Sequence, residues 1–286
     1  MTTRFILAAA LLACACAEPA PSSEARAQEQ AASIAGSLFA STPDRQWRLP
    51  DQLREVSGLA AAPGGRLFAH DDERAVIYEI DASQGRIVKA FALGDPVETG
   101  DFEGLAITPA GQFWLVTSQG ELLRFNEGSD GEIVRFARFD AGLRGVCEIE
   151  GLASLAAEES LILACKRNEA RGMRDTISLY AWRDGAGMAR PWRRLPEAEL
   201  IRAAGIEHFR PSSLDIDPRT GRLILLSARD GAVAELDGDR VSSARALAAQ
   251  HVQAEGAAVL ADGSLAVADE GGDGRALLSI YARVAE

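Results

Sequence analysis

Several features that commonly indicate a function are scarce or missing from this sequence. Basic residues are outnumbered 30 to 42, and the resulting net charge of −12 repels phosphate groups, which argues against a nucleic-acid partner. The Gly-x-Ser-x-Gly nucleophile elbow does not occur, and after the first residues no apolar run is long enough to cross a bilayer. A globular composition remains, with 47% hydrophobic residues, enough to bury the core of one large all-β domain or two smaller ones.

The beginning of the chain has the pattern of an export signal. Arg4 precedes an apolar run over residues 5–13 that is too short for a permanent membrane helix. The run ends in Leu11-Leu12-Ala13-Cys14, which resembles the bacterial lipobox and predicts that Cys14 is acylated. The alternative is an ordinary secretory signal that is cut after Ala15-Cys16-Ala17.

The sequence thus predicts three parts. Residues 1–16 form the signal peptide with its lipobox, residues 17–45 form a disordered tether rich in Ala, Ser, Pro, Glu and Gln, and residues 46–286 form the folded domain. The expected location is the periplasmic side of the bacterial cell envelope, with membrane contact only through the lipid anchor. We expect a monomer.

A short pattern recurs five times in the folded domain. A Ser or Glu begins each copy and is followed by Gly-Leu or a close variant, at Ser57, Glu103, Glu150, Ser212 and Glu255. The separations are close to the ~40–50-residue period of a four-stranded propeller blade. The sequence therefore predicts an all-β fold, a β-propeller with five blades, with six blades as the alternative.

Each repeat has the same internal order of strands and turns. The second repeat contains GLAIT, PAGQ, FWLVTS, ELLRFN and EIVRFARF, in which the first two strands are apolar and the last two alternate. The fifth repeat lacks its last strand, and Gln46-Trp47-Arg48-Leu49 is the candidate to replace it and close the ring. Residues 196–205 predict a short helix between a proline and a glycine.

The series SGL, DFEGLA, EGLA, SSL and EGAA, with IYEID after the first hairpin, resembles the SdiA-regulated (YjiK-like) propeller family and, more loosely, the esterase-like phytase family. The resemblance covers residues 55–285. It implies an exported propeller, in some members with a metal in the channel. Two departures stand out: Ser212-Ser213 replaces the usual Ser-Gly, and the third repeat carries an insertion.

The hairpins predict where the recurring residues lie. Turn positions pair Ser57 with Asp71, Glu103 with Ser118, and Glu255 with Asp269 or Glu270. The first residues of all five inner strands then gather at one mouth of the central channel.

Acidic side chains should crowd this mouth. Their mutual repulsion raises their pKa values unless a cation compensates, and calcium suits them because it takes about six to eight oxygen ligands in flexible geometry. The predicted metal ligands are Glu103, Glu150, Glu255, Asp71 and Asp269. The alternative is that each glutamate caps backbone N–H groups of the adjacent blade, which explains the recurrence without a metal.

Imidazoles and cations are expected on the same face. Imidazoles near carboxylates can ligate zinc, move protons or sense pH, and cations can hold an anionic group of a ligand. The predicted ligand-binding residues are His70, His208, His251, Lys166 and Arg229. Coincidence remains the alternative for the histidines, and ion pairing with nearby acids remains the alternative for the two cations.

Cys147 and Cys165 are the two cysteines of the folded domain. An oxidising compartment permits a disulfide, but the predicted pairing of Cys165 with Glu150 leaves Cys147 about 10 Å away. The sequence leaves their pairing open.

Three functions fit these features. The first is binding of a cation, calcium first, together with a small molecule or peptide at the acidic channel mouth. The second is metal-assisted hydrolysis of an ester, phosphoester or lactone. The third is an envelope scaffold without a channel ligand. Propellers host all three, so the sequence does not decide whether the protein is an enzyme.

Overall fold

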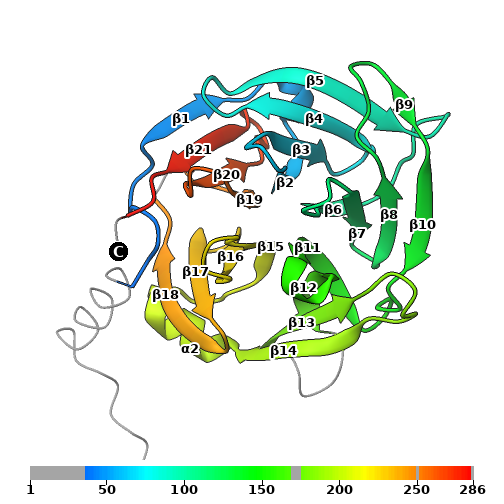
Figure 1. The fold of residues 1–286 in the computed structure, drawn as a ribbon. Coiled ribbons are helices and arrows are strands. Elements are labelled where there is room, and N and C mark those ends of the chain that lie inside the picture. Colours follow the sequence, from blue (N-terminus) through cyan, green and yellow to red (C-terminus); the bar gives the residue numbers. More distant parts are fainter. Residues whose placement is uncertain (1–35, 169–174, 249–250, 285–286) are drawn as a thin grey trace, which may run out of the picture.

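The computed structural model describes residues 36–168, 175–248 and 251–284. They form five β-sheets arranged as blades around a central channel (Figure 1). The predicted five-bladed propeller is therefore confirmed. In the described chain no helix is long and apolar enough to cross a membrane. The predicted signal peptide and Cys14 lie outside the described residues.

Each blade has four antiparallel strands, the innermost of which carries the recurring motif, and blade 1 has a short fifth strand at its outer edge. Blade 1 consists of β2 (Val56–Ala61), β3 (Leu67–Asp71), β4 (Val76–Asp81) and β5 (Arg86–Leu93). Blade 2 consists of β6 (Phe102–Ile107), β7 (Phe113–Thr117), β8 (Glu121–Phe125) and β10 (Phe136–Asp140). Blade 3 consists of β11 (Cys147–Leu155), β12 (Ser160–Asn168), β13 (Thr176–Trp182) and β14 (Arg190–Pro196).

Blade 4 consists of β15 (Pro211–Ile216), β16 (Leu223–Ser227), β17 (Ala232–Asp237) and β18 (Arg240–Ala246). Blade 5 consists of β19 (Ala254–Val259), β20 (Leu265–Asp269), β21 (Leu277–Tyr281) and β1 (Arg45–Arg48). The helix α2 (Glu197–Ala204) joins blades 3 and 4, between Pro196 and Gly205 as predicted.

The N-terminal strand closes the ring. β1 pairs antiparallel with β21, with Trp47 opposite Leu278, and so supplies the outer strand that the fifth repeat lacks. This pairing removes an open sheet edge at the point where the two ends of the chain meet. The predicted closure is confirmed.

The recurring glycine explains how the inner strands pack around the channel. A Cβ atom on Gly104 would lie 2.9 Å from the backbone nitrogen of Leu152 in the next blade, and one on Gly151 would lie 2.9 Å from that of Leu214. A Cβ atom on Gly256 would lie 3.1 Å from the nitrogen of Leu59, which closes the circle from blade 5 to blade 1. Because such separations are shorter than nearly all real Cβ contacts, a glycine allows each inner strand to approach the next.

The fourth repeat replaces this glycine by Ser213. Its hydroxyl oxygen accepts a hydrogen bond from the backbone N–H of Ala257 in blade 5, at 3.0 Å. The preceding Ser212 donates to the carbonyl oxygen of Ala254, at 2.6 Å. Between these blades, hydrogen bonds of side chains therefore take the place of direct backbone approach.

Two sequence predictions need correction. The predicted strand EIVRFARF is divided: β9 (Ile133–Val134) pairs in parallel with β5 of blade 1, and β10 belongs to blade 2. The last part of the predicted tether is also ordered against the propeller. Leu38 and Phe39 are buried beside Tyr281 in the core of blades 4 and 5, and the backbone N–H of Leu38 donates to Glu235 at 2.8 Å. Among the described residues, the folded part thus also includes residues 36–45.

Candidate functional site

The recurring Ser and Glu positions are β-bulges in all five blades. In blade 2, Phe102 pairs with Thr117 and Gly104 with Val116, which leaves Glu103 without a cross-strand partner. The same register shift occurs at each of the other motif positions: Ser57, Glu150, Ser212 and Glu255. The predicted pairs of Glu103 with Ser118, of Ser57 with Asp71 and of Glu255 with Asp269 or Glu270 are therefore wrong. Asp71 pairs with Val56, and Asp269 pairs with Ala254. A bulge re-aims the side chain of its extra residue, which is how the motif turns toward the channel.

Three motif glutamates meet in one cavity at the channel mouth. It has a volume of about 160 Å³ and is lined by Glu55, Val56, Ser57, Asp72, Glu103, Glu150, Lys166, Gln253, Glu255 and Glu270. The motif residues stand at the beginnings of the inner strands β2, β6, β11 and β19, which surround the channel in Figure 1. We call this cavity the acidic mouth.

Lys166 reaches the acidic mouth through a second irregularity. Glu148 pairs with Arg167 and Ile149 with Cys165, so Lys166 is itself an extra residue of β12. Its ammonium group donates to Glu150 at 2.9 Å, and Glu150 is almost fully buried. Lys166 therefore forms the ion pair that was the predicted alternative to ligand binding.

The three motif glutamates of the acidic mouth hold their protons unusually strongly. Burial raises the pKa of Glu103 to about 8, and the charges of Glu150 and Asp101 add to this effect. Burial also raises the pKa values of Glu150 and Glu255 to about 7, although Lys166 acts in the opposite direction on both. A bound cation would lower the free-energy cost of keeping these carboxylates ionised.

The pKa of Lys166 responds to the same charges. Its burial alone would lower the pKa, but the nearby carboxylates of Glu150, Glu255 and Glu148 outweigh burial and raise it. Lys166 therefore stays charged and compensates part of the negative charge in the cavity.

A second acidic pair lies at the rim of the cavity. Burial raises the pKa of Glu270 to about 7, and its hydrogen bond with Glu55 adds to this rise. The same hydrogen bond lowers the pKa of Glu55, because it stabilises the ionised form of that carboxyl group. Gln253 also donates to Glu270. Glu55 and Gln253 were missed from the sequence because they lie just before the motifs, outside the repeated positions.

The hydrogen bonds of the motif glutamates do not match the predicted caps. Glu103 accepts from the hydroxyl of Ser57 at 3.3 Å, and Glu150 accepts from Lys166. In the described part of the chain these partners are side chains, not backbone N–H groups of the adjacent blade. The recurrence of glutamate therefore has no capping explanation at these two positions.

The acidic mouth offers ligand atoms of the kind that a hard cation binds, but these atoms are not close enough together to bind one directly. Carboxylate oxygens are the ligands that calcium prefers. Within residues 36–168, 175–248 and 251–284, no three His, Cys, Asp or Glu residues come close enough together to hold a bare metal ion. Calcium would thus have to be bound through water, or the side chains would have to draw together around it.

Two of the predicted metal ligands lie outside the acidic mouth. Asp71 accepts from the backbone N–H of Arg74 at 2.7 Å and lines a neighbouring groove of about 440 Å³. Asp269 is buried and bonds to the Nδ1 atom of His251 at 2.5 Å, while Nε2 of His251 bonds to the hydroxyl of Tyr281 at 2.5 Å. Asp269 and His251 thus belong to a buried network that joins β20 to β21.

The other predicted ligand-binding residues are also placed elsewhere. His70 is fully buried, donates through Nδ1 to the carbonyl oxygen of Asp71 at 2.8 Å, and has its pKa lowered to about 4 by burial. It is therefore neutral at pH 7. His208 is half-buried and Arg229 is exposed, and neither lines the acidic mouth. Of the five predicted residues, Lys166 alone does so.

Cys147 and Cys165 form a disulfide, with their Cα atoms 5.7 Å apart. The sequence estimate of the distance was too long because Cys165 pairs with Ile149 instead of Glu150, and because Lys166 bulges out of the strand between Cys165 and Arg167. The disulfide thus joins β11 and β12 beside the two bulges that direct Glu150 and Lys166 into the cavity.

Comparison with solved structures finds proteins of similar fold. The crystal structure of Myxococcus xanthus glutaminyl cyclase matches with a TM-score of 0.54 and 13% identity, over 85% of this chain and 97% of that chain. A streptogramin B lyase matches at 0.49 and 10% identity, over 83% and 97% of the two chains. The PQQ-bound aldose sugar dehydrogenase from Streptomyces coelicolor matches at 0.49 and 13% identity, over 85% and 99%.

The feature shared with the glutaminyl cyclase is the propeller fold. At 13% identity the likeness to the glutaminyl cyclase extends to the fold alone. No family model and no curated protein matches the sequence. The resemblance to the SdiA-regulated family therefore stays a prediction from the motifs.

Proposed function

We propose that the protein is a binding module that holds a cation at the acidic mouth. The observation that carries this proposal is the convergence of Glu103, Glu150 and Glu255 from three blades on one cavity, with raised pKa values. A cation between them would offset both their burial and their mutual repulsion. Calcium is the first metal to test, with part of its coordination supplied by water.

Because of Lys166, we expect the bound ligand to carry an anionic group as well. Its ammonium group lines the same cavity and keeps its charge beside Glu150. A small ligand that carries both a cationic or metal-bound part and an anionic group, such as a carboxylate, would contact both charge types. The acylation of Cys14 would hold this module at the membrane surface of the cell envelope, where such ligands arrive by diffusion.

Hydrolysis remains a second candidate with narrower support. Glu103, with a pKa of about 8, is protonated at neutral pH and lies in the same cavity as Lys166, an arrangement that suits a general acid beside an anionic substrate. In the described chain no histidine lines this cavity. We therefore place binding before turnover.

Calorimetric titration of calcium into the protein at pH 8, with magnesium and zinc in parallel, tests the proposal. We expect saturable binding of calcium, and a loss of at least tenfold in affinity in the Glu103→Gln and Glu255→Gln variants, because each removes one carboxylate without changing its size. Asp237→Asn, which changes an exposed acid of blade 4, is the matched control. Binding that is equal in all variants, or absent for every ion, would contradict the proposal.

A further inference from the structure

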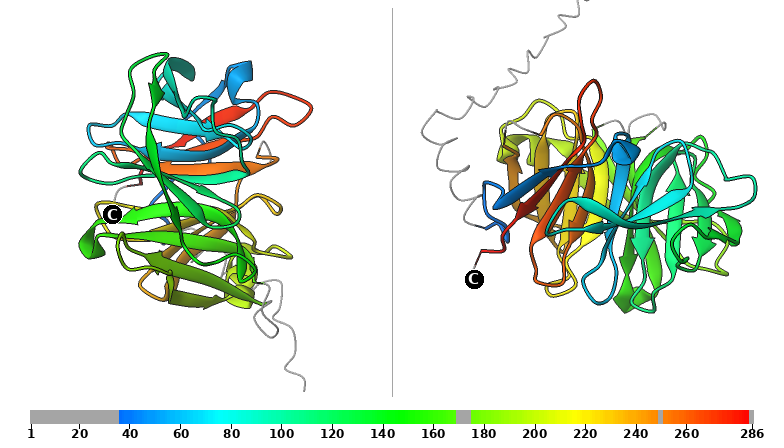
Figure 2. Two further views of the ribbon diagram at one scale, coloured as in Figure 1. Left: turned by 90° about the vertical axis from the view of Figure 1, so that its right-hand side faces the viewer. Right: turned by 90° about the horizontal axis from the view of Figure 1, so that it is seen from above.

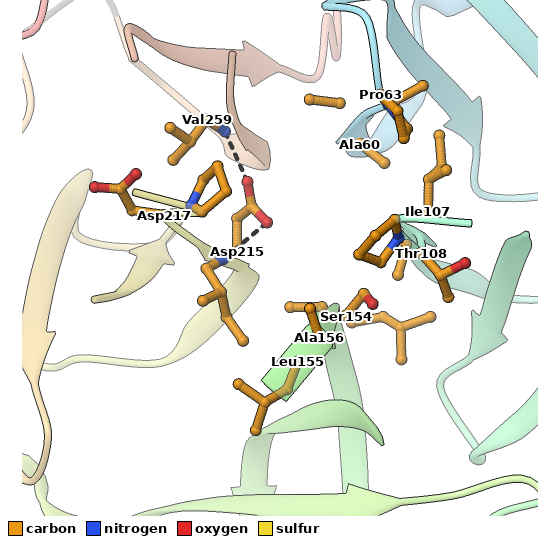
Figure 3. Close-up of a pocket in the computed structure, with 18 of the residues that line it drawn as sticks. Ala60, Pro63, Ile107, Thr108, Ser154, Leu155, Ala156, Asp215, Asp217 and Val259 are labelled. Atoms are coloured by element: carbon orange, nitrogen blue, oxygen red, sulfur yellow. Dashed lines mark hydrogen bonds between the residues drawn. The ribbon is translucent and has the colours of Figure 1, made fainter. Parts of the chain in front are cut away.

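The channel has a second opening with a different chemistry. A pocket of about 440 Å³ lies where the inner strands end, and all five blades contribute to it. The acidic mouth lies where the same strands begin, so the two openings are at opposite ends of the channel. We call the pocket at the strand ends the second mouth; Figure 3 shows its lining.

The wall of the second mouth is apolar. It is built mainly from Ala, Leu, Ile, Val and Pro side chains, among them Ala60, Leu105, Ile107, Leu152 and Val259. No Lys, Arg or His belongs to the lining that the described residues form. A concave apolar pocket of this size with a small number of polar groups is typical of sites for small molecules.

One carboxylate is directed into this apolar surrounding. Figure 3 shows the carboxyl group of Asp215 turned toward the middle of the lining residues, and that of Asp217 turned away from them. Asp217 has its own partners, since it accepts from the hydroxyl of Thr220 at 2.7 Å and from Arg283 at 3.0 Å. Asp215 is thus the acid that a ligand in the pocket would meet.

The repeat does not require an acid at this position. Three residues after the recurring Ser or Glu, the other four blades have alanine: Ala60, Ala106, Ala153 and Ala258. The same inner strand therefore forms with a methyl group at this position. Asp215 is a departure that belongs to blade 4 only.

Its hydrogen bonds do not explain the negative charge. The Asp215 carboxylate accepts from the backbone N–H of Val259 at 2.7 Å and from that of Ile216 at 2.8 Å. A neutral side chain such as asparagine accepts a backbone N–H at a lower cost of burial. A carboxylate has about four acceptor positions, so the two bonds leave others free for a ligand. Burial, with a smaller contribution from the charge of Asp217, raises the pKa of Asp215 to about 7 despite these two donors.

We propose that the second mouth binds a small amphipathic amine, whose apolar body contacts the Ala, Leu, Ile and Pro walls and whose ammonium group donates to the Asp215 carboxylate. The ammonium group supplies the positive charge that the lining lacks. The net charge of −12 favours the approach of such a cation. This site is independent of cation binding at the acidic mouth.

Calorimetry with hexylamine, butylamine, hexanol and hexanoate tests the proposal. We expect hexylamine to bind at least tenfold more tightly than hexanol or hexanoate. Hexylamine should also bind several-fold more tightly than butylamine for each added methylene, because the longer chain covers more of the apolar wall. Equal binding of hexylamine and hexanol, or affinity that does not depend on chain length, would overturn the proposal.

Two variants locate the site. Asp215→Ala restores the residue of the other blades, and Asp215→Asn keeps the shape of the side chain without its charge. Each should lower the affinity for hexylamine at least tenfold, whereas Asp239→Asn, at an exposed acid of blade 4, should change it less than twofold. If Asp215 only joined blades 4 and 5, its variants would lower the melting temperature and leave hexylamine binding unchanged, and that result would also overturn the proposal.

Discussion

The pKa values of single residues give the acidic mouth a pH signature. The pKa values of Glu103, Glu150 and Glu255 rise from 4.5 to about 8, 7 and 7 on folding. Between about pH 5 and pH 8 the folded state binds more protons than the unfolded state. The free energy of unfolding therefore falls as the pH rises through this range. Without added cation we therefore expect a lower melting temperature at pH 8 than at pH 5.5.

Glu103→Gln separates this effect from other titrations. The variant removes the group with the highest of the three pKa values, so its melting temperature should decline less steeply between pH 5.5 and 8. Calcium should raise the melting temperature of the unaltered protein more at pH 8 than at pH 5.5, because it competes with protons for the same carboxylates. Identical pH profiles for the variant and the unaltered protein would contradict the assignment.

The motif glycine makes a different prediction at the residue scale. Gly104→Ala places a methyl group 2.9 Å from the backbone nitrogen of Leu152, which has no room to move because it belongs to the neighbouring inner strand. We expect a loss of about 1–3 kcal/mol in the free energy of unfolding, measured with urea. A loss below about 0.5 kcal/mol would mean that the inner strands are less tightly packed than described.

At the scale of elements, the segment before the first motif acts as part of blade 5. Leu38, Phe39 and Leu49 are buried, and β1 pairs with β21. A chain that begins at Asp51 should melt at least about 10 °C lower, because it loses this buried surface and leaves the edge of β21 open. A chain that begins at Gly36 is the matched control and should keep the melting temperature. Equal melting of both chains would contradict ring closure by β1.

Most of this architecture is readable from the sequence, because the spacing of the motifs and the turn residues reports the blades directly. The register is not, because a bulge adds one residue to a strand without disturbing its apolar pattern. Phe102 before the bulged Glu103 and Leu105 after it are both buried, so the apolar pattern does not reveal the extra residue. The ordered segment before β1 had a signal in the adjacent Leu38 and Phe39, two large apolar residues within a polar stretch.

The candidate site was predicted only in part. Glu103, Glu150 and Glu255 are found through recurrence, and Lys166 through its position after a second strand. Asp269 and His251 were expected at the mouth but bond to each other in the core, since a histidine and an acid that stand near a motif in the chain need not share its cavity. Asp215 was not predicted, although the sequence shows it as the one acid at a repeat position that is alanine in the other four blades.

At the scale of the whole molecule, the ring gives the channel two unlike ends. One end brings together carboxylates from several blades, and the other is an apolar pocket with one carboxylate directed into it. Side views show the blades as a disc with loops on both faces (Figure 2). Ligands of different chemistry can therefore meet the same molecule from opposite faces.

The proposed function depends on a cation that the bulged glutamates bind at the acidic mouth. Crystals soaked in terbium, which binds oxygen ligands as calcium does, test it most directly through the anomalous difference map. We expect a peak in the cavity that Glu103, Glu150 and Glu255 line, within direct or single-water contact of their carboxylates, and no peak there in crystals of the Glu103→Gln, Glu255→Gln double variant. Peaks confined to acids on the outer surface, with the cavity empty, would contradict it.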